Sequence, residues 1–274
     1  MSAINFQEIV EGITRGNVVP YLDPGVLAGV KSVADDSGIP ADSDSLILAM
    51  TEGKPLSPRL MYEFPRAAMH YENKRGRKFI ENFLHQTYAE KNWQHSNFHH
   101  WLAEIEAPLV IDTNRDTQMQ EFYTSRAHTL VVGVARIAAH PYRFDIYTYK
   151  NGQYESCELE DVDTSLPVLF KPLGSPLPKA SFIASDADFV DYITELMGGF
   201  AIPSWLKEYR VDKQYVFLGM RFTRDTERMI MSDMVYAAAE NTGWAFIPEP
   251  TEKERRFLEK RNIAIVEEDW TTLL

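Results

Sequence analysis

Short apolar runs alternate along the chain with longer stretches in which apolar residues recur at helical spacing. The runs predict strands buried on both faces, near 18–22, 108–111, 130–134, 166–170, 215–218, 244–247 and 263–266. Helical spacing follows the later runs, at 186–197, 225–240 and 251–260. Strands that alternate with helices predict an α/β fold, a mostly parallel sheet with helices on both faces.

Two segments interrupt this alternation. From about residue 55 to 106 the helical spacing continues without a strand, and Pro58 suits the first turn of a helix, so we expect a helical insertion. Residues 143–158 flank Asn151-Gly152, a pair preferred in two-residue hairpin turns, and predict a small β-hairpin flap. Residues 1–274 then form one Rossmann-like domain that carries an insertion and a flap.

Composition narrows the classes of partner. A net charge of −12 and a pI near 5.1 repel nucleic acid and anionic lipid at long range. The first segment, 2–15, has neither the order of a signal peptide nor an apolar span of about 20 residues, so no membrane partner is expected. Cys157 is the only cysteine, which excludes an intramolecular disulfide and a four-cysteine zinc site and fits a reducing cytoplasm.

Four polar or glycine-containing segments directly follow predicted strands. They are residues 23–25, 112–116, 171–175 and 219–225. Ligands of an open parallel sheet bind beyond the carboxyl ends of its strands. We therefore expect these segments to meet at one crevice.

The order of these segments resembles the sirtuin-like family, in its bacterial branch without a zinc module. The likeness spans about residues 15–267 and depends on the Gly turn at Gly25, on Thr113-Asn114, on the Lys-x-x-Gly-Ser turn at 171–175, on the acidic segment at 185–192 and on Gly219 with Asp225. It implies binding of NAD or an ADP-ribose-like nucleotide without zinc, and it allows a homo-oligomer.

The first motif departs from the family's Gly-Ala-Gly-x-Ser turn, which binds NAD. Residues 23–27 fall on its five positions, and only Gly25 is kept; 26–33 are expected to continue as a helix. Asp23 places a carboxylate where phosphates would lie, and two unit charges ~4 Å apart at a dielectric near 20 repel by ~4 kcal/mol. Alternatively Asp23 rotates away, holds a cation, or is there because Asp-Pro-Gly turns well.

The second motif resembles the family's Thr-Asn-Tyr-Asp and is better kept. Thr113, Asn114 and Asp116 match, while Arg115 replaces the aromatic residue. In members that hydrolyse NAD the Asn contacts the nicotinamide ribose and the attacking water, so Asn114 is the candidate catalytic residue if the protein is active; its alternative role is a turn residue. Arg115 supplies a phosphate-binding fork or faces solvent.

The third motif lacks the family's catalytic histidine. The His-Gly pair falls on Leu173-Gly174, and leucine cannot accept a proton, whereas general-base catalysis contributes about 10²- to 10⁴-fold. His128 and His140, the other histidines of this half, are expected in loops or at the surface. The histidines at 95, 99 and 100 share an amphipathic helix, and no metal is expected there.

We therefore expect a catalytically degenerate protein that keeps the cleft and binds a nucleotide-like ligand or a protein partner. The expected contacts are Asp23, Gly25, Thr113, Asn114, Asp116, Gly174, Ser175, Gly219 and Asp225. One alternative is an active NAD hydrolase of the bacterial defence type, in which Asn114 positions water. The other is a structural protein of a complex, without a small ligand.

Overall fold

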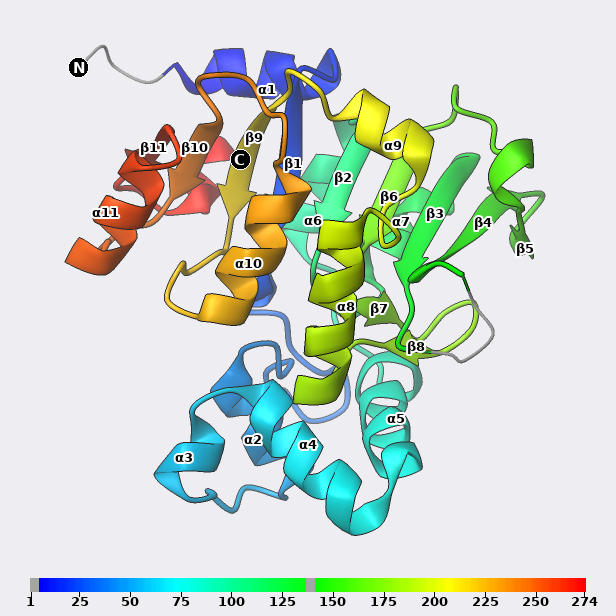
Figure 1. Cartoon of the computed structure of the whole chain (residues 1–274), viewed down its shortest axis with the longest axis vertical. Coiled ribbons are helices and arrows are strands. Elements are labelled where there is room, and N and C mark those ends of the chain that lie inside the picture. The colour runs from blue at the N-terminus through cyan, green and yellow to red at the C-terminus, as the bar shows by residue number, and fades with distance from the viewer. Residues whose placement is uncertain (1–4, 137–140) are drawn as a thin grey trace.

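The computed structural model describes residues 5–136 and 141–274. Within these ranges a nine-stranded sheet has the strand order β11-β10-β9-β1-β2-β6-β3-β4-β5 (Figure 1). Its strands are β1 (Val18–Leu22), β2 (Leu109–Asp112), β3 (His128–Gly133), β4 (Phe144–Lys150), β5 (Gln153–Ser156), β6 (Val168–Lys171), β9 (Gln214–Leu218), β10 (Gly243–Phe246) and β11 (Ile263–Val266). The strands from β11 to β3 pair in parallel, and β4 and β5 are antiparallel. The predicted Rossmann-like α/β sheet is confirmed.

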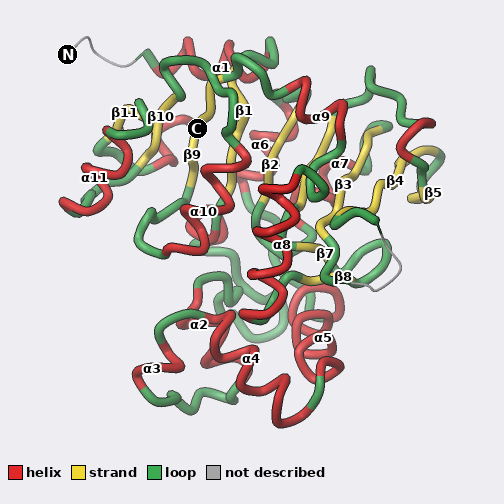
Figure 2. The backbone as a smooth tube through the Cα atoms, viewed as in Figure 1, coloured by secondary structure: helices red, strands yellow, loops and turns green. Residues whose placement is uncertain are grey.

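Helices cover both faces of the sheet, as Figure 2 shows in front of and behind the strands. One core contains residues of α1 (Phe6–Thr14), α6 (Asn97–Glu104) and α7 (Gln118–Tyr123). The other contains residues of α8 (Asp186–Gly198), α9 (Ser204–Tyr209), α10 (Asp225–Met234) and α11 (Glu252–Glu259). On β1, Val18 and Leu22 pack into the first core and Val19 and Tyr21 into the second. Successive side chains of a strand point to opposite faces, so burial on both faces explains the uninterrupted apolar runs.

The helical insertion lies between β1 and β2 in the chain. It contains α2 (Ser43–Met50), α3 (Pro58–Met61), α4 (Phe64–Arg75), α5 (Arg77–His85) and the π-helical turn η2 (Gln86–Glu90), and α6 follows. It begins earlier than the predicted residue 55, because the Asp42 side chain caps α2 by accepting from the Ser45 amide at 2.9 Å. In Figure 1 helices α2 to α5 form a group beyond the strand ends, and α4 packs against α8.

The predicted hairpin flap forms from β4 and β5. Asn151 and Gly152 both have positive φ, 54° and 84°, as the two-residue turn requires. Because β4 also pairs with β3, the flap extends the edge of the main sheet. A second hairpin, β7 (Gly174–Ser175) with β8 (Ser181–Phe182), was not predicted.

The helix expected over residues 26–33 is wrong. Only a short 3₁₀ turn, η1 (Pro24–Leu27), forms there. Gly29 then adopts φ 87°, and Lys31 forms an antiparallel bridge with Gly38, so the chain turns away from the helical path. The protein therefore lacks, directly after β1, the helix N-terminus that usually binds a pyrophosphate.

Candidate functional site

The cleft of this protein lies where the order of strands reverses. β1 pairs on one side with β2, the next strand in the chain, and on the other side with β9, a much later strand. Beyond the carboxyl ends of these strands lie two adjoining chambers that share Asp23, Pro24, Ala41, Ser43, Arg224 and Glu227. The inner chamber, which also includes Asn114, holds about 60 Å³. The outer chamber, which also includes Gly25, holds about 510 Å³.

The four segments expected to converge do meet at this cleft. Asp23, Asn114 and Leu173 all line the inner chamber, together with Thr113 and Arg115. The insertion closes the opposite wall with Leu46, Glu63, Phe64 and Tyr88. The remaining predicted residues at the cleft, Gly25 and Gly219, line the outer chamber.

Four other predicted contacts line neither chamber: Asp116, Gly174, Ser175 and Asp225. Asp116 is buried, and its Oδ1 accepts from the Gln118 amide at 2.8 Å. The Ser175 hydroxyl donates to Gln120 Oε1 at 2.5 Å, so it belongs to the packing of the β7–β8 hairpin.

The other two of these residues have structural roles in their own elements. Gly174 has φ 97°, and a Cβ there would lie 2.1 Å from the Ser181 carbonyl oxygen, so close packing of the hairpin requires glycine. Asp225 is exposed at the first turn of α10 and pairs with Arg228. Gly174 and Asp225 thus have roles outside the cleft.

The Asp23 carboxyl is buried, with 6% of the residue exposed, and accepts a hydrogen bond from the Thr113 hydroxyl. Burial and, to a smaller extent, the charge of Asp112 raise the pKa of Asp23 to about 7, although the Thr113 hydrogen bond and the charge of Arg115 oppose the rise. A group with this pKa carries only part of a charge at neutral pH. The full repulsion of phosphate that the sequence suggested is therefore reduced.

Glu227, in the first turns of α10, is a residue of the cleft that sequence reasoning missed. It lies in both chamber walls, and burial raises its pKa to about 9, with Asp23 and Glu63 adding to the rise and Arg224 opposing it. At neutral pH the Glu227 carboxyl is therefore protonated and neutral. The sequence does not show the helical phase that turns Glu227 inward and leaves Asp225 outside. Glu63 and Arg224, the residues directly before α4 and α10, were missed too, because only the packing of these helices brings them to the cleft.

The backbone amides of the first turn already have acceptors. The Asp23 amide donates to Leu218 O at 3.0 Å, the Gly25 amide to Gly219 O at 2.9 Å and the Val26 amide to Asp23 O at 3.1 Å. Pro24 has no amide hydrogen. A Cβ on Gly25 would lie 2.6 Å from Gly219 O, so the glycine serves the close approach of the two loops. This turn does not offer amides to a pyrophosphate.

A buried ion pair between Asp112 and Lys171 holds Asn114 in place. Lys171 Nζ donates to Asp112 Oδ2 at 2.6 Å, and neither side chain is exposed. Asp112 Oδ1 accepts from both the backbone amide and the Nδ2 of Asn114, each at 3.0 Å. Because a carboxylate only accepts, Nδ2 must be the atom directed at Asp112, and Oδ1 is left as an acceptor at the inner chamber.

Arg115 does not face solvent, so that alternative is wrong. Only 8% of the residue is exposed, and its Nε and Nη2 donate to the Ile183 carbonyl at 3.2 and 2.5 Å. Its guanidinium also lies 5.7 Å from the centre of the Phe64 ring. Arg115 therefore ties the strand-end loop to the segment before α8.

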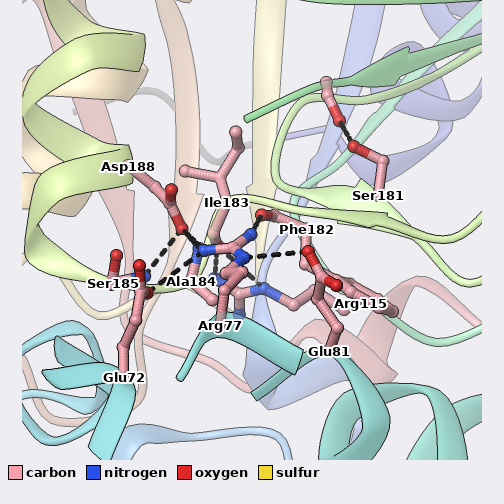
Figure 3. A network of polar contacts seen from close by, with 11 residues as sticks. Glu72, Arg77, Glu81, Arg115, Ser181, Phe182, Ile183, Ala184, Ser185 and Asp188 are labelled. Atoms are coloured by element: carbon pink, nitrogen blue, oxygen red, sulfur yellow. Dashed lines mark hydrogen bonds and ion pairs between the residues drawn. The ribbon is translucent and has the colours of Figure 1, made fainter. Parts of the chain in front are cut away.

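The same segment anchors the insertion (Figure 3). Arg77 of α5 pairs with Asp188 and Glu81 and donates to the Phe182 carbonyl at 2.7 Å. Asp188 also accepts from the amide of Ser185 at 3.0 Å, which completes the capping box of α8. The predicted acidic segment at 185–192 thus supports the wall of the cleft rather than its lining.

No histidine described by the structure lines the cleft. Leu173, the residue expected at the position of the family's histidine, lines the inner chamber. His128 is buried in β3, against the expectation of a loop or surface position, because its ring bridges Arg126 O at 3.0 Å and the Tyr154 hydroxyl at 2.9 Å. His140 lies outside the described residues. Over 5–136 and 141–274, no group of three or more His, Cys, Asp and Glu side chains is placed to hold a metal ion.

None of the helices in the described part of the chain has the length and apolarity to cross a membrane.

A family model for the SIR2-like domain matches residues 108–266, which is more than half of the chain. The match runs from the start of β2 to the end of β11, so it contains Asn114, Leu173 and Gly219 but neither the Asp23 turn nor the insertion. No curated protein matches the chain.

Proposed function

The chain belongs to the SIR2-like domain family, and from this premise we propose that its cleft binds an NAD- or ADP-ribose-like nucleotide without turning it over. The observation that carries the proposal is the meeting of Asn114 and Leu173 in one chamber. Asn114 Oδ1 can accept a hydrogen bond from a ribose hydroxyl. Leu173 supplies no base where the family has its histidine, so the ligand is bound rather than hydrolysed.

The sizes of the two chambers support binding of a nucleotide in the outer one. Ligand pockets are typically about 300–1,000 Å³, and the outer chamber holds about 510 Å³. The inner chamber, at about 60 Å³, does not admit a nicotinamide ring with its ribose in this conformation. The nicotinamide ring of NAD would therefore not fit on the Asn114 side of the cleft without rearrangement, whereas the terminal ribose of ADP-ribose, which carries no such ring, would be the part that contacts Asn114.

The second candidate is an NAD hydrolase, and one observation favours it. Asp23 lines the inner chamber beside Asn114, and its pKa of about 7 suits a general base at neutral pH. In that reaction Asp23 would take a proton from water held by Asn114, the oxygen would attack the ribose carbon, and nicotinamide would leave. A third candidate is an acidic structural protein of a complex, which would bind no nucleotide.

Titration calorimetry with NAD and ADP-ribose, together with chromatography of NAD after incubation, distinguishes these candidates. We expect binding of ADP-ribose, weaker binding by Asn114→Ala, and no nicotinamide above the buffer blank. Release of nicotinamide that disappears in both Asn114→Ala and Asp23→Asn would favour the hydrolase. Absence of heat with both ligands would contradict nucleotide binding and favour the third candidate, for which a stoichiometric partner should copurify.

A further inference from the structure

Arg224 occupies the junction of the two chambers. It is the residue directly before α10 and lines both chambers. Its guanidinium lies 4.7 Å from the centre of the Tyr62 ring, and it makes no hydrogen bond or ion pair with any residue in the described ranges. Stacking on an aromatic face orients a guanidinium and leaves its in-plane N–H groups free.

Two other cationic groups of the cleft are already held by hydrogen bonds. Arg221 forms a two-pronged pair with the buried Glu254, at 2.8 and 3.0 Å. Arg115 donates to the Ile183 carbonyl. Lys31 lines only the outer chamber, at an exposed site 3.9 Å from Asp36. Among the described residues, Arg224 is thus the one cation that lines both chambers.

The acidic neighbours of Arg224 neutralise it only in part at neutral pH. Burial raises the pKa of Glu227 to about 9 and that of Asp23 to about 7, and it also raises the pKa of Glu63. A protonated carboxyl carries no charge and can donate a hydrogen bond. The junction therefore offers an incoming anion one guanidinium, beside carboxyls that carry less negative charge than exposed carboxyls would.

A phosphorylated ligand needs such a group here. The amides of the Asp23, Gly25 and Val26 turn have internal acceptors, so the backbone does not supply the positive site. The protein as a whole carries a net charge of −12, which makes a local cation necessary to hold an anion.

We propose that Arg224 binds a phosphate group of the ligand at the junction of the chambers, in place of the turn amides, and that the ligand is a nucleoside phosphate whose nucleoside lies in the outer chamber. This inference rests on the proposed nucleotide binding. It adds the residue that selects a phosphorylated ligand over the free nucleoside.

Calorimetry with AMP and adenosine on the full chain tests this selection. Arg224→Gln should lower affinity for AMP by about 10- to 100-fold, the effect of losing a charge-assisted hydrogen-bonding partner, and should leave adenosine within twofold of wild type. Arg224→Lys keeps the charge and loses the planar guanidinium, so its affinity for AMP should lie between those of wild type and Arg224→Gln.

Arg66→Gln is the matched control. The Arg66 guanidinium lies 5.5 Å from the same Tyr62 ring, yet Arg66 lines neither chamber. Arg66→Gln should therefore bind AMP within about threefold of wild type, since Arg66 lines neither chamber and so makes no direct contact with the phosphate. Equal AMP affinities of wild type and Arg224→Gln would overturn the inference while leaving nucleotide binding intact. A wild type that binds neither AMP nor ADP-ribose would overturn both.

Discussion

Asp23 and Glu227 are two interacting carboxyls of the cleft, and they differ in how far the sequence could identify them. Asp23 follows a strand and matches a motif position, so it could be found, but its charge was overestimated because burial was not visible. Glu227 could not be found, since nothing in the sequence distinguishes its inward side chain from the exposed Asp225. Positions after strands are predictable from sequence, whereas protonation state and helical phase depend on the packed structure.

Glu227→Gln should change how stability depends on pH. The folded pKa of about 9 exceeds the ordinary value of 4.5, so between these values the folded state binds a proton that the unfolded state has lost. The free energy of unfolding therefore falls as pH rises through this window. The neutral Gln removes this term, so the melting temperature of the variant should decline less than that of wild type between pH 5 and 9.

Asp225→Asn is the control for this pH series, because Asp225 is exposed and two residues away on the same helix. A plot of its melting temperature against pH should run parallel to that of wild type from pH 5 to 9. If the plot for Glu227→Gln were also parallel to that of wild type, Glu227 would not be held in its protonated form.

Among the elements, those defined by their own pattern were predicted and those defined by tertiary contacts were not. The strands, α8 and α11 follow apolar runs and helical spacing, and they lie close to the predicted ranges. The β7–β8 hairpin has two-residue strands, too short for a pattern. The η1 turn replaced a helix because Gly29 and the bridge at Lys31 redirect the chain.

Arg77 joins α5 of the insertion to α8 and to the segment before it, which gives a prediction at the level of elements. Arg77→Met leaves Asp188, whose side chain is only 10% exposed, without its guanidinium partner. We expect a loss of about 2 kcal/mol in unfolding free energy, lower than for a fully buried pair because Arg77 is partly solvated. Hydrogen exchange should accelerate in α4 and α5 before it does in the sheet.

Lys78→Met, at an exposed position next to Arg77 on α5, is the control and should change neither stability nor exchange appreciably. Unchanged exchange in α4 and α5 of Arg77→Met would mean that the Arg77 contacts do not hold the insertion against α8.

At the scale of the whole molecule, the topology explains why one cleft gathers the motifs. The chain leaves β1 toward β2 and returns much later as β9 on the other side, so loops about 200 residues apart in the chain meet beyond the same strand ends. This convergence was predictable from the order of segments. The division into two chambers was not, because the inner one is closed by insertion residues such as Phe64 that no motif marks.

The central claim is that this cleft takes a nucleotide with its phosphate at Arg224, and a crystal soaked with ADP-ribose tests it most directly. The account predicts density for the nucleoside in the outer chamber, which Gly25, Gly219 and Lys31 line, with a phosphate within hydrogen-bonding distance of Arg224. Density at another surface, or an empty cleft at a ligand concentration that saturates the protein in solution, would contradict it.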